Sequence, residues 1–161
     1  MSDKDTQTGT EDYLRTRSRN GGPENITSMI AFDVTNGVPS GANILNATLE
    51  LYMYSTKKSS DVLDIHGVLL SWSEGGVTWS SYGWKSGAYD SAVEASTATG
   101  TAGWKSWDVT ALVQSWVTGA MPDYGFYLLN DSAGGGHDDW YYSREYVTSN
   151  LRPYLEVTFV P

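Results

Sequence analysis

The chain has 161 residues, which fits a single domain, and its 17 glycines and 13% aromatic residues are typical of β-sandwiches with many turns. It has no cysteine, which excludes disulfides, thiolate metal sites and cysteine nucleophiles. A net charge of −9 disfavours nucleic acid and anionic membranes as partners, and no apolar run approaches the length of a membrane span.

The first segment, MSDKDTQTGT, is polar and predicts a loop or tail. It lacks the apolar stretch that signal peptides carry, so either an export signal has been removed or the protein reaches its site without one, as a virion component does. We therefore expect a polar N-terminal arm, residues 1–11, followed by a single β-sandwich domain, residues 12–161.

Most of the remaining chain shows the alternation of apolar and polar residues that is typical of half-buried strands. In ATLELYMYS, for example, leucine and methionine occupy one face, and a glutamate and two tyrosines occupy the other. The pattern is weaker in residues 91–97 and 104–109, and residues 28–34 indicate a strand covered on both faces. The predicted strands are residues 13–18, 28–34, 47–55, 62–70, 91–97, 104–109, 124–130, 140–146 and 154–160.

One segment has helical spacing instead. Residues 108–119 place apolar side chains three or four positions apart, Asp108 or Thr110 can cap the start, and Gly119 can end the helix. We expect a short helix near residues 110–118 that closes one end of the domain. About ten strands with one helix predict an all-β fold, a jelly-roll-like antiparallel β-sandwich.

Residues suited to catalysis do not form a recognisable constellation. His66 and His137 fit no zinc-site spacing, and the sequence contains neither a nucleophile elbow nor a phosphate loop. The sequence alone does not exclude a pair of catalytic carboxylates like those of glycosidases, because their required separation of about 5–9 Å is a spatial property. We nevertheless predict that the protein is not an enzyme. The acids that suggest such a pair are Glu74, Asp108, Asp138, Asp139 and Glu145.

Several tryptophans lie in WSEGGVTWSSYGWKSG, residues 72–87, where aliphatic neighbours are few. Trp72 follows a strand that ends in two leucines, so we expect its ring in the core, where burial of an aromatic side chain stabilises the fold. Trp84 has no apolar periodicity around it and is a candidate ligand-binding ring beside Tyr82 and Lys85; the alternative is a core position. Two further tryptophans have apolar neighbours and are assigned to the core: Trp107 and Trp116.

Arg15, Arg17 and Arg19 alternate along the first strand and therefore share one face. Guanidinium groups bind carboxylates through two parallel hydrogen bonds, so this face suits a uronate or an acidic partner protein. The alternative, which the acidic composition favours, is a solvated face balanced by nearby aspartate and glutamate.

The segment NDSAGGGHDDWYYSRE, residues 130–145, groups aspartates with flexible glycines. Clustered carboxylate oxygens suit calcium, which is the one cofactor that the sequence suggests. EF-hand spacing is absent, and a polar surface loop is the alternative. His137 and Trp140 can contact a sugar by hydrogen bonding and stacking. The candidate calcium ligands are Asp131, Asp138 and Asp139.

A set of motifs occurs in the order seen in one known family: GANILNATLELYMYS, WSEGGVTW, WDVTALVQSWVTG, YGFYLLN and SREYVTSNLRPYLEVTF. Over roughly residues 12–160 the chain resembles DNRLRE-type domains, also classed as carbohydrate-binding module family 96 and related to disaggregatase-type repeats. The resemblance implies a β-sandwich that serves as a non-catalytic module in secreted or surface-attached microbial proteins. Some such modules bind acidic polysaccharide such as alginate. The resemblance also implies that Trp72 and Trp79 are architectural.

The chain departs from the resembled family at its start, where members usually have a strand containing Asp-Thr-Tyr. Here Asp5 and Thr6 stand in a segment without apolar alternation, so we expect the first strand to be shortened or absent. A sandwich that lacks an edge strand exposes backbone groups that invite pairing with another chain. We therefore predict that residues 1–12 form no regular strand of their own sandwich, and that they either extend onto a neighbouring molecule or lie over it as an irregular arm.

These observations favour a carbohydrate-binding or adhesive surface module, displayed extracellularly or on a virion surface, with polysaccharide as its partner. The alternative is a purely structural subunit that binds neighbouring subunits through residues 1–12, such as a virion decoration or fibre protein or a repeat of a surface filament. Neither hypothesis involves nucleic acid or membrane insertion.

Overall fold

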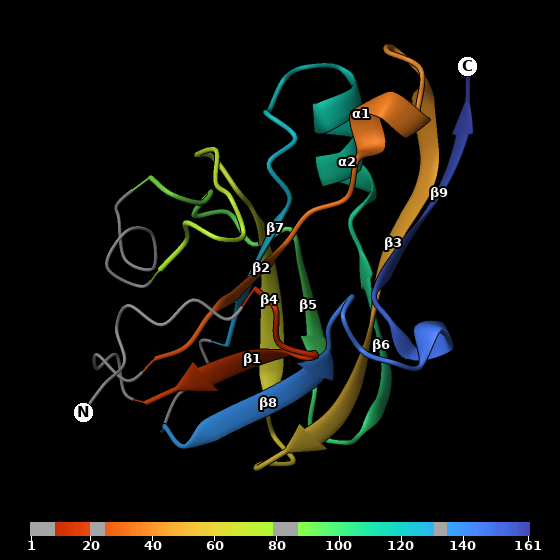
Figure 1. Ribbon diagram of the computed structural model, residues 1–161. Coiled ribbons are helices and arrows are strands. Elements are labelled where there is room, and N and C mark those ends of the chain that lie inside the picture. Colours follow the sequence, from red (N-terminus) through yellow and green to blue (C-terminus); the bar gives the residue numbers. More distant parts are fainter. Residues whose placement is uncertain (1–8, 20–24, 79–86, 131–134) are drawn as a thin grey trace.

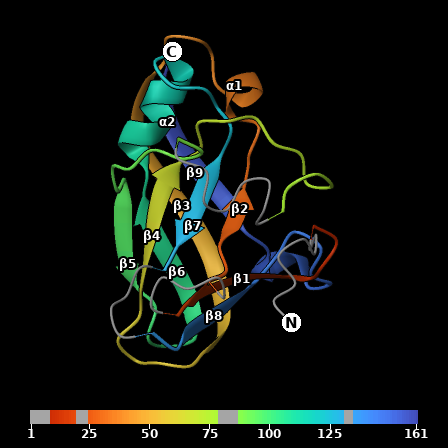
Figure 2. The same ribbon diagram turned by 90° about the vertical axis from the view of Figure 1, so that its left-hand side faces the viewer.

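The computed structural model describes residues 9–19, 25–78, 87–130 and 135–161 (Figure 1). Two antiparallel sheets pack face to face, with the hydrophobic core between them (Figure 2). The predicted all-β antiparallel sandwich is confirmed.

The larger sheet has five strands. It contains β1 (Tyr13–Ser18), β8 (His137–Tyr142), β3 (Asn43–Thr56) and β6 (Gly103–Asp108) in that order, and β9 (Tyr154–Val160) also pairs with β3. The first half of β3 pairs with β9 and its last residues pair with β8, while β6 occupies the opposite edge. As a result, the side chains of five strands meet on one outer face.

The smaller sheet has four strands: β2 (Ser28–Ile30), β7 (Phe126–Leu129), β4 (Val62–Gly67) and β5 (Ala95–Ala98), in that order. The inner face of this sheet packs against the inner face of the larger one.

The prediction of a strand over residues 28–34 is wrong beyond Ile30. The carboxylate of Asp33 accepts a hydrogen bond from the backbone N–H of Asn36 at 3.4 Å and thereby caps a helical turn, α1 (Val34–Gly37). The turn removes these residues from the sheet, although Val34 is still buried in the core.

The predicted helix is α2 (Thr110–Val117), which closes one end of the sandwich, whereas β1 and β8 run across the opposite end (Figures 1 and 2). Asp108 accepts hydrogen bonds from the backbone N–H and the hydroxyl of Thr110, at 3.0 and 2.6 Å, directly before the helix. Gly119 follows the helix with a φ of 73°, a left-handed conformation that glycine adopts without a steric penalty. A short 3₁₀ helix, η2 (Ser149–Leu151), precedes β9.

Alternation along β3 separates the inside of the sandwich from the outside. Leu49 and Leu51 are fully buried in the core, whereas Glu50 between them lies on the outer face. Trp107 and Trp116 are also in the core, as predicted. The indole Nε1 of Trp107 donates a hydrogen bond to the carbonyl of Leu63 at 3.0 Å, so its one polar group is satisfied there.

Trp72 packs at the margin of the fold rather than in the main core. Its ring is half-buried against a smaller cluster that contains Val68, Ala88 and Tyr127, and its Nε1 donates to the carbonyl of Tyr124 at 2.7 Å. Trp79 lies outside the described residues. Of the helices that the described ranges contain, none is long and apolar enough to cross a membrane.

Candidate functional site

The outer face of the five-stranded sheet carries a row of aromatic side chains. Because side chains alternate along a strand, the tyrosines of β3 point away from the core that its leucines fill. Strand pairing places further rings beside them, since Trp104 of β6 lies opposite Tyr52, and Tyr154 of β9 lies opposite Glu50. The aromatic row consists of Tyr13, Tyr52, Tyr54, Trp104, Trp140, Tyr142, Tyr146 and Tyr154.

At one end of the aromatic row, on β1, β8 and β3, the rings pack closely against one another. The ring centroids of Tyr13 and Tyr54 lie 4.8 and 6.4 Å from that of Trp140. Tyr142 stacks on Tyr54 at 4.6 Å and on Tyr146 at 3.5 Å. Stacked rings cover one another's faces, so this end presents mainly ring edges and hydroxyl groups.

The other end of the row, on β3, β6 and β9, is more open. The Trp104 ring lies 5.4 Å from both Tyr52 and Tyr154, at interplanar angles of 89° and 65°. Trp104 is 39% exposed and Tyr154 is 45% exposed, whereas the other rings of the row are half-buried. This exposed pair offers apolar ring surface to a ligand.

The packed end of the row is organised by an ion pair. Arg15 donates from Nε and Nη2 to the two carboxylate oxygens of Asp138, each at 2.7 Å, and its guanidinium carbon lies 4.2 Å from the centre of the Trp140 ring. Lys57 Nζ lies 3.2 Å from the same carboxylate. Burial acts to raise the pKa of Asp138, but the hydrogen bonds from Arg15 and Lys57 outweigh burial and hold that pKa below its usual value.

The open end of the row is surrounded by carboxylates. Glu50 accepts a hydrogen bond from the hydroxyl of Ser106, and Glu156 lies on the outer face of β9, two residues after Tyr154. Burial raises the pKa of the Tyr154 phenol, and the negative charges of Glu50 and Glu156 raise it further. The two ends of the row therefore differ in charge, with cations around Asp138 at one end and carboxylates at the other.

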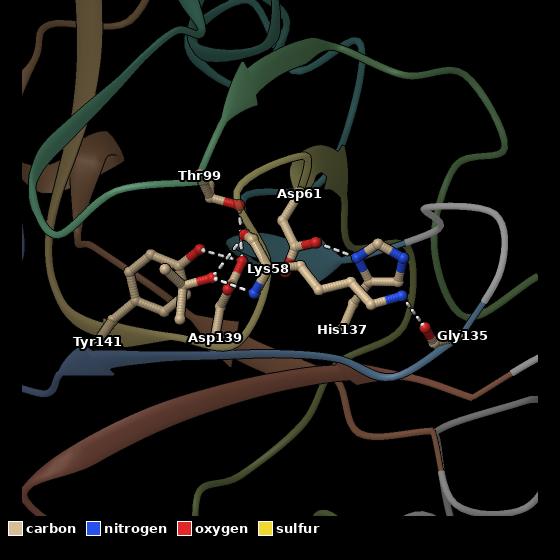
Figure 3. A network of polar contacts seen from close by, with 8 residues as sticks. Lys58, Asp61, Thr99, Gly135, His137, Asp139 and Tyr141 are labelled. Atoms are coloured by element: carbon tan, nitrogen blue, oxygen red, sulfur yellow. Dashed lines mark hydrogen bonds and ion pairs between the residues drawn. The ribbon is translucent and has the colours of Figure 1, made fainter.

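A separate polar network lies inside the sandwich (Figure 3). His137 Nδ1 contacts the carboxylate of Asp61, and Asp139 accepts hydrogen bonds from the hydroxyls of Thr99 and Tyr141 at 2.6 and 3.4 Å. Burial raises the pKa of Asp139 to about 6, because it penalises the charged carboxylate. These groups are buried, so the network belongs to the interior and not to the surface that a ligand meets.

The structure brings two of the candidate residues from the sequence together, Arg15 and Trp140, on the outer face of β1 and β8. Arg17 follows on the same face of β1, in register with Asp138, and Arg19 is exposed just beyond the strand. His137 does not join them, because its side chain is only 3% exposed. Outside the described residues lie Tyr82, Trp84, Lys85 and Asp131.

The two described calcium candidates do not converge on one point. Asp138 is paired with Arg15 and Lys57, whereas its neighbour Asp139 belongs to the interior network. Consecutive residues of a strand point to opposite faces, which explains the separation. Within the described ranges, no group of three or more histidine, aspartate or glutamate residues is arranged to hold a metal ion.

Sequence reasoning did not select the open end of the row. A signal was present, because Tyr52 and Tyr54 alternate with the core residues of β3 and so had to face outward. Nothing in the sequence shows that Trp104 and Tyr154, from two other strands, lie beside them. The pairing of β6 and β9 with β3 creates that end of the row.

A two-sheet sandwich with a row of rings along one outer sheet face has the architecture of a small β-sandwich module. The chain belongs to carbohydrate-binding module family 96, whose family model matches residues 1–159. It is also 33% identical over 120 residues to the tRNA3(Ser)-specific nuclease WapA of Bacillus spizizenii. That match covers 72% of this chain but only 5% of the nuclease, so the chain corresponds to a small part of that protein.

Proposed function

We propose that the protein is a non-catalytic carbohydrate-binding module and that a polysaccharide chain lies along the aromatic row. The observation that carries this proposal is the exposed ring pair of Trp104 and Tyr154, which continues a row of rings across the sheet. The C–H faces of sugars pack on aromatic rings while sugar hydroxyls bond to polar groups at the rim, which matches rings flanked by carboxylates and phenols.

The dimensions of the row favour a chain over a single sugar. The rings span β1, β8, β3 and β6, and neighbouring strands are separated by about 4.8 Å, so the row is about 14 Å wide. A surface of that width can contact several consecutive sugar residues. Polymers of this kind occur outside cells, and we propose that the module is displayed extracellularly or on a virion surface.

Several candidates from the sequence remain part of the proposal as contacts beyond the row. Arg17 and Arg19 extend the packed end of the row along β1 and can reach an acidic group of a bound glycan or partner. Tyr82, Trp84 and Lys85 are proposed as a second set of contacts. His137 is not retained, because its buried ring has no path to a surface ligand.

The alternative, a structural subunit that assembles through residues 1–12, remains a prediction. Residues 9–12 form turns and bends rather than a strand, and Ser143 holds them to their own domain by donating to the carbonyls of Glu11 and Asp12 at 2.7 and 3.0 Å. Glu11 and Asp12 are nevertheless exposed, so the proposed contact with a neighbouring molecule can involve any part of residues 1–12.

The experiment that tests the proposed function is affinity electrophoresis against a panel of neutral and acidic polysaccharides, followed by titration calorimetry on those that retard the protein. We expect at least one polysaccharide to bind, and Tyr154→Ala to weaken that binding. The matched control is Tyr124→Ala, because Tyr124 is a similarly exposed ring, at 37%, away from the aromatic row. Equal losses in the two variants, or no retardation by any polysaccharide, would refute the proposal.

A further inference from the structure

The open end of the aromatic row has a charge that limits what it can bind. Glu50 and Glu156 project from the outer faces of β3 and β9. Glu50 lies directly opposite Tyr154 in the strand register, and Glu156 follows Tyr154 by two residues along β9. The pKa of Tyr154 is raised in part by both carboxylates, which shows that their negative charge reaches the exposed ring. A ligand that stacks on Trp104 and Tyr154 therefore comes within reach of two anions.

The basic residues around this end do not offset the two carboxylates. Arg152, two residues before Tyr154, donates from Nε to the carbonyl of Tyr146 at 2.7 Å. The charges that act on the Tyr154 phenol are those of Glu50 and Glu156. Lys105 follows Trp104 in β6, but alternation turns it away from the outer face, and its Nζ donates to Thr101 at 3.3 Å. Arg15 lies at the packed end of the row, where its guanidinium binds the carboxylate of Asp138 through Nε and Nη2.

We propose that the Trp104–Tyr154 end of the row is a subsite for an uncharged sugar residue, and that it disfavours uronates. This inference rests on the proposed function, since it specifies the ligand class of the same face. The exposed rings take the C–H face of the sugar, and the carboxylates of Glu50 and Glu156 accept hydrogen bonds from its hydroxyls. Carboxylate acceptors suit hydroxyl donors, whereas a sugar carboxylate would meet like charge.

The size of the discrimination follows from Coulomb repulsion. Two like charges about 6 Å apart in water repel enough to weaken binding about threefold, so two carboxylates together weaken uronate binding about tenfold at low salt. Screening by salt reduces this difference, because the charges are exposed to solvent. Binding of a neutral sugar should change little with salt.

The test compares the same polysaccharide in two forms, as the uronate and after reduction of its carboxyl groups to neutral alcohols, using alginate and polygalacturonate as the starting polymers. Neutral β-glucan, mannan and xylan complete the set. Binding is measured by calorimetry at low and at high salt with the wild-type protein and with Trp104→Ala. We expect the reduced form to bind about tenfold more tightly than the uronate form at low salt, and Trp104→Ala to weaken binding of the reduced form.

A charge variant sharpens this test. Glu156→Gln keeps the shape of the side chain and removes one anion, so we expect it to raise affinity for the uronate form about threefold at low salt and to leave affinity for the neutral form within twofold. Glu94→Gln, which removes a carboxylate from the segment before β5 in the other sheet, is the control and should change neither affinity.

The outcomes separate this inference from the proposed function. In one outcome, the uronate forms bind as tightly as their reduced counterparts and lose affinity in Trp104→Ala. This result would overturn the inference but would leave carbohydrate binding on the aromatic row intact. Binding to no neutral member of the set would also overturn it. Binding to no glycan of either charge would refute the proposed function as well.

Discussion

Arg15 donates two hydrogen bonds of 2.7 Å to Asp138 across the β1–β8 strand pair. The Nε and Nη2 edge of the guanidinium is thus bound to a carboxylate of the protein itself, and the side chain is held over the ring of Trp140. We infer that Arg15 acts on a ligand mainly through the ring that it orients. The sequence suggested a direct contact with a uronate, and with the pair intact the Nη1 group would have to make it.

The first prediction concerns the stability that this pair provides. Arg15→Ala removes the main cationic partner of the Asp138 carboxylate, which is 2% exposed, and leaves it paired with the solvent-exposed Lys57. We expect the free energy of unfolding to fall by about 1–2 kcal/mol, since a buried carboxylate that loses its main partner is costly. Urea denaturation measures the change.

The control for that prediction is Arg144→Ala. Arg144 also pairs with carboxylates, Glu74 and Glu145, but its side chain is 70% exposed, so we expect a change below about 0.5 kcal/mol. Equal effects of the two substitutions would contradict the role given to the Arg15–Asp138 pair.

The second prediction concerns the pH dependence of stability. The pKa of Asp139 is raised by burial to about 6, above its value in the unfolded chain. Between about pH 4 and pH 6 the folded state therefore binds more protons than the unfolded state. The stabilising contribution of Asp139 to the free energy of unfolding is fully present below about pH 4 and is lost as the pH rises through about 6. In Asp139→Asn this dependence should disappear.

The measurement is the difference in unfolding free energy between wild type and Asp139→Asn across that range. Asp138→Asn, measured below about pH 4, provides a comparison of opposite sign. The pKa of Asp138 is lowered, so its contribution to the free energy of unfolding is lost as the pH falls through that lowered value. If the unfolding free energies of the wild type and Asp139→Asn differ by the same amount at every pH from 7 to 4, the pKa of Asp139 is not raised.

The third prediction concerns the two exposed rings. Trp104→Ala and Tyr154→Ala should each weaken binding of a neutral polysaccharide about tenfold, because each removes a ring face worth about 1–1.5 kcal/mol to a stacked sugar. Both rings are exposed on the outer sheet face, so thermal unfolding should change little. Large losses of stability in these variants would show that the rings serve the fold instead.

The fourth prediction concerns the N-terminal arm. Deleting residues 2–8 leaves the hydrogen bonds from Ser143 to Glu11 and Asp12 in place, so the melting temperature should stay nearly unchanged. If the arm joins neighbouring molecules, light scattering should show weaker self-association after the deletion. A strongly lowered melting temperature would instead mean that the arm is part of its own sandwich.

Much of the fold was predictable because the signals are local. Residues 13–18 and 154–160 alternate and form β1 and β9 with the predicted bounds, and the helical spacing near residue 110 corresponds to α2. The strand over residues 28–34 was over-extended, since its apolar pattern does not reveal that Asp33 caps a turn. Alternation also predicted correctly which face of β3 enters the core.

The candidate site was less predictable because it depends on strand register. Arg15 and Trp140 were both selected, but only the pairing of β1 with β8 places one over the other. Trp104 meets Tyr52 through the pairing of β6 with β3, between residues 52 positions apart in the chain. His137 looked like a loop residue, yet it begins β8 and points inward to Asp61.

The most direct test of the central claim is to map the bound glycan by two-dimensional NMR on the ¹⁵N-labelled protein. Titration with a polysaccharide fragment that binds should shift the indole N–H of Trp104 and the backbone amides of β3, β6 and β9 around Tyr154, and should leave the buried indole of Trp107 in place. Shifts confined to the four-stranded sheet or to loops away from the aromatic row would contradict the assignment of this face as the carbohydrate-binding surface.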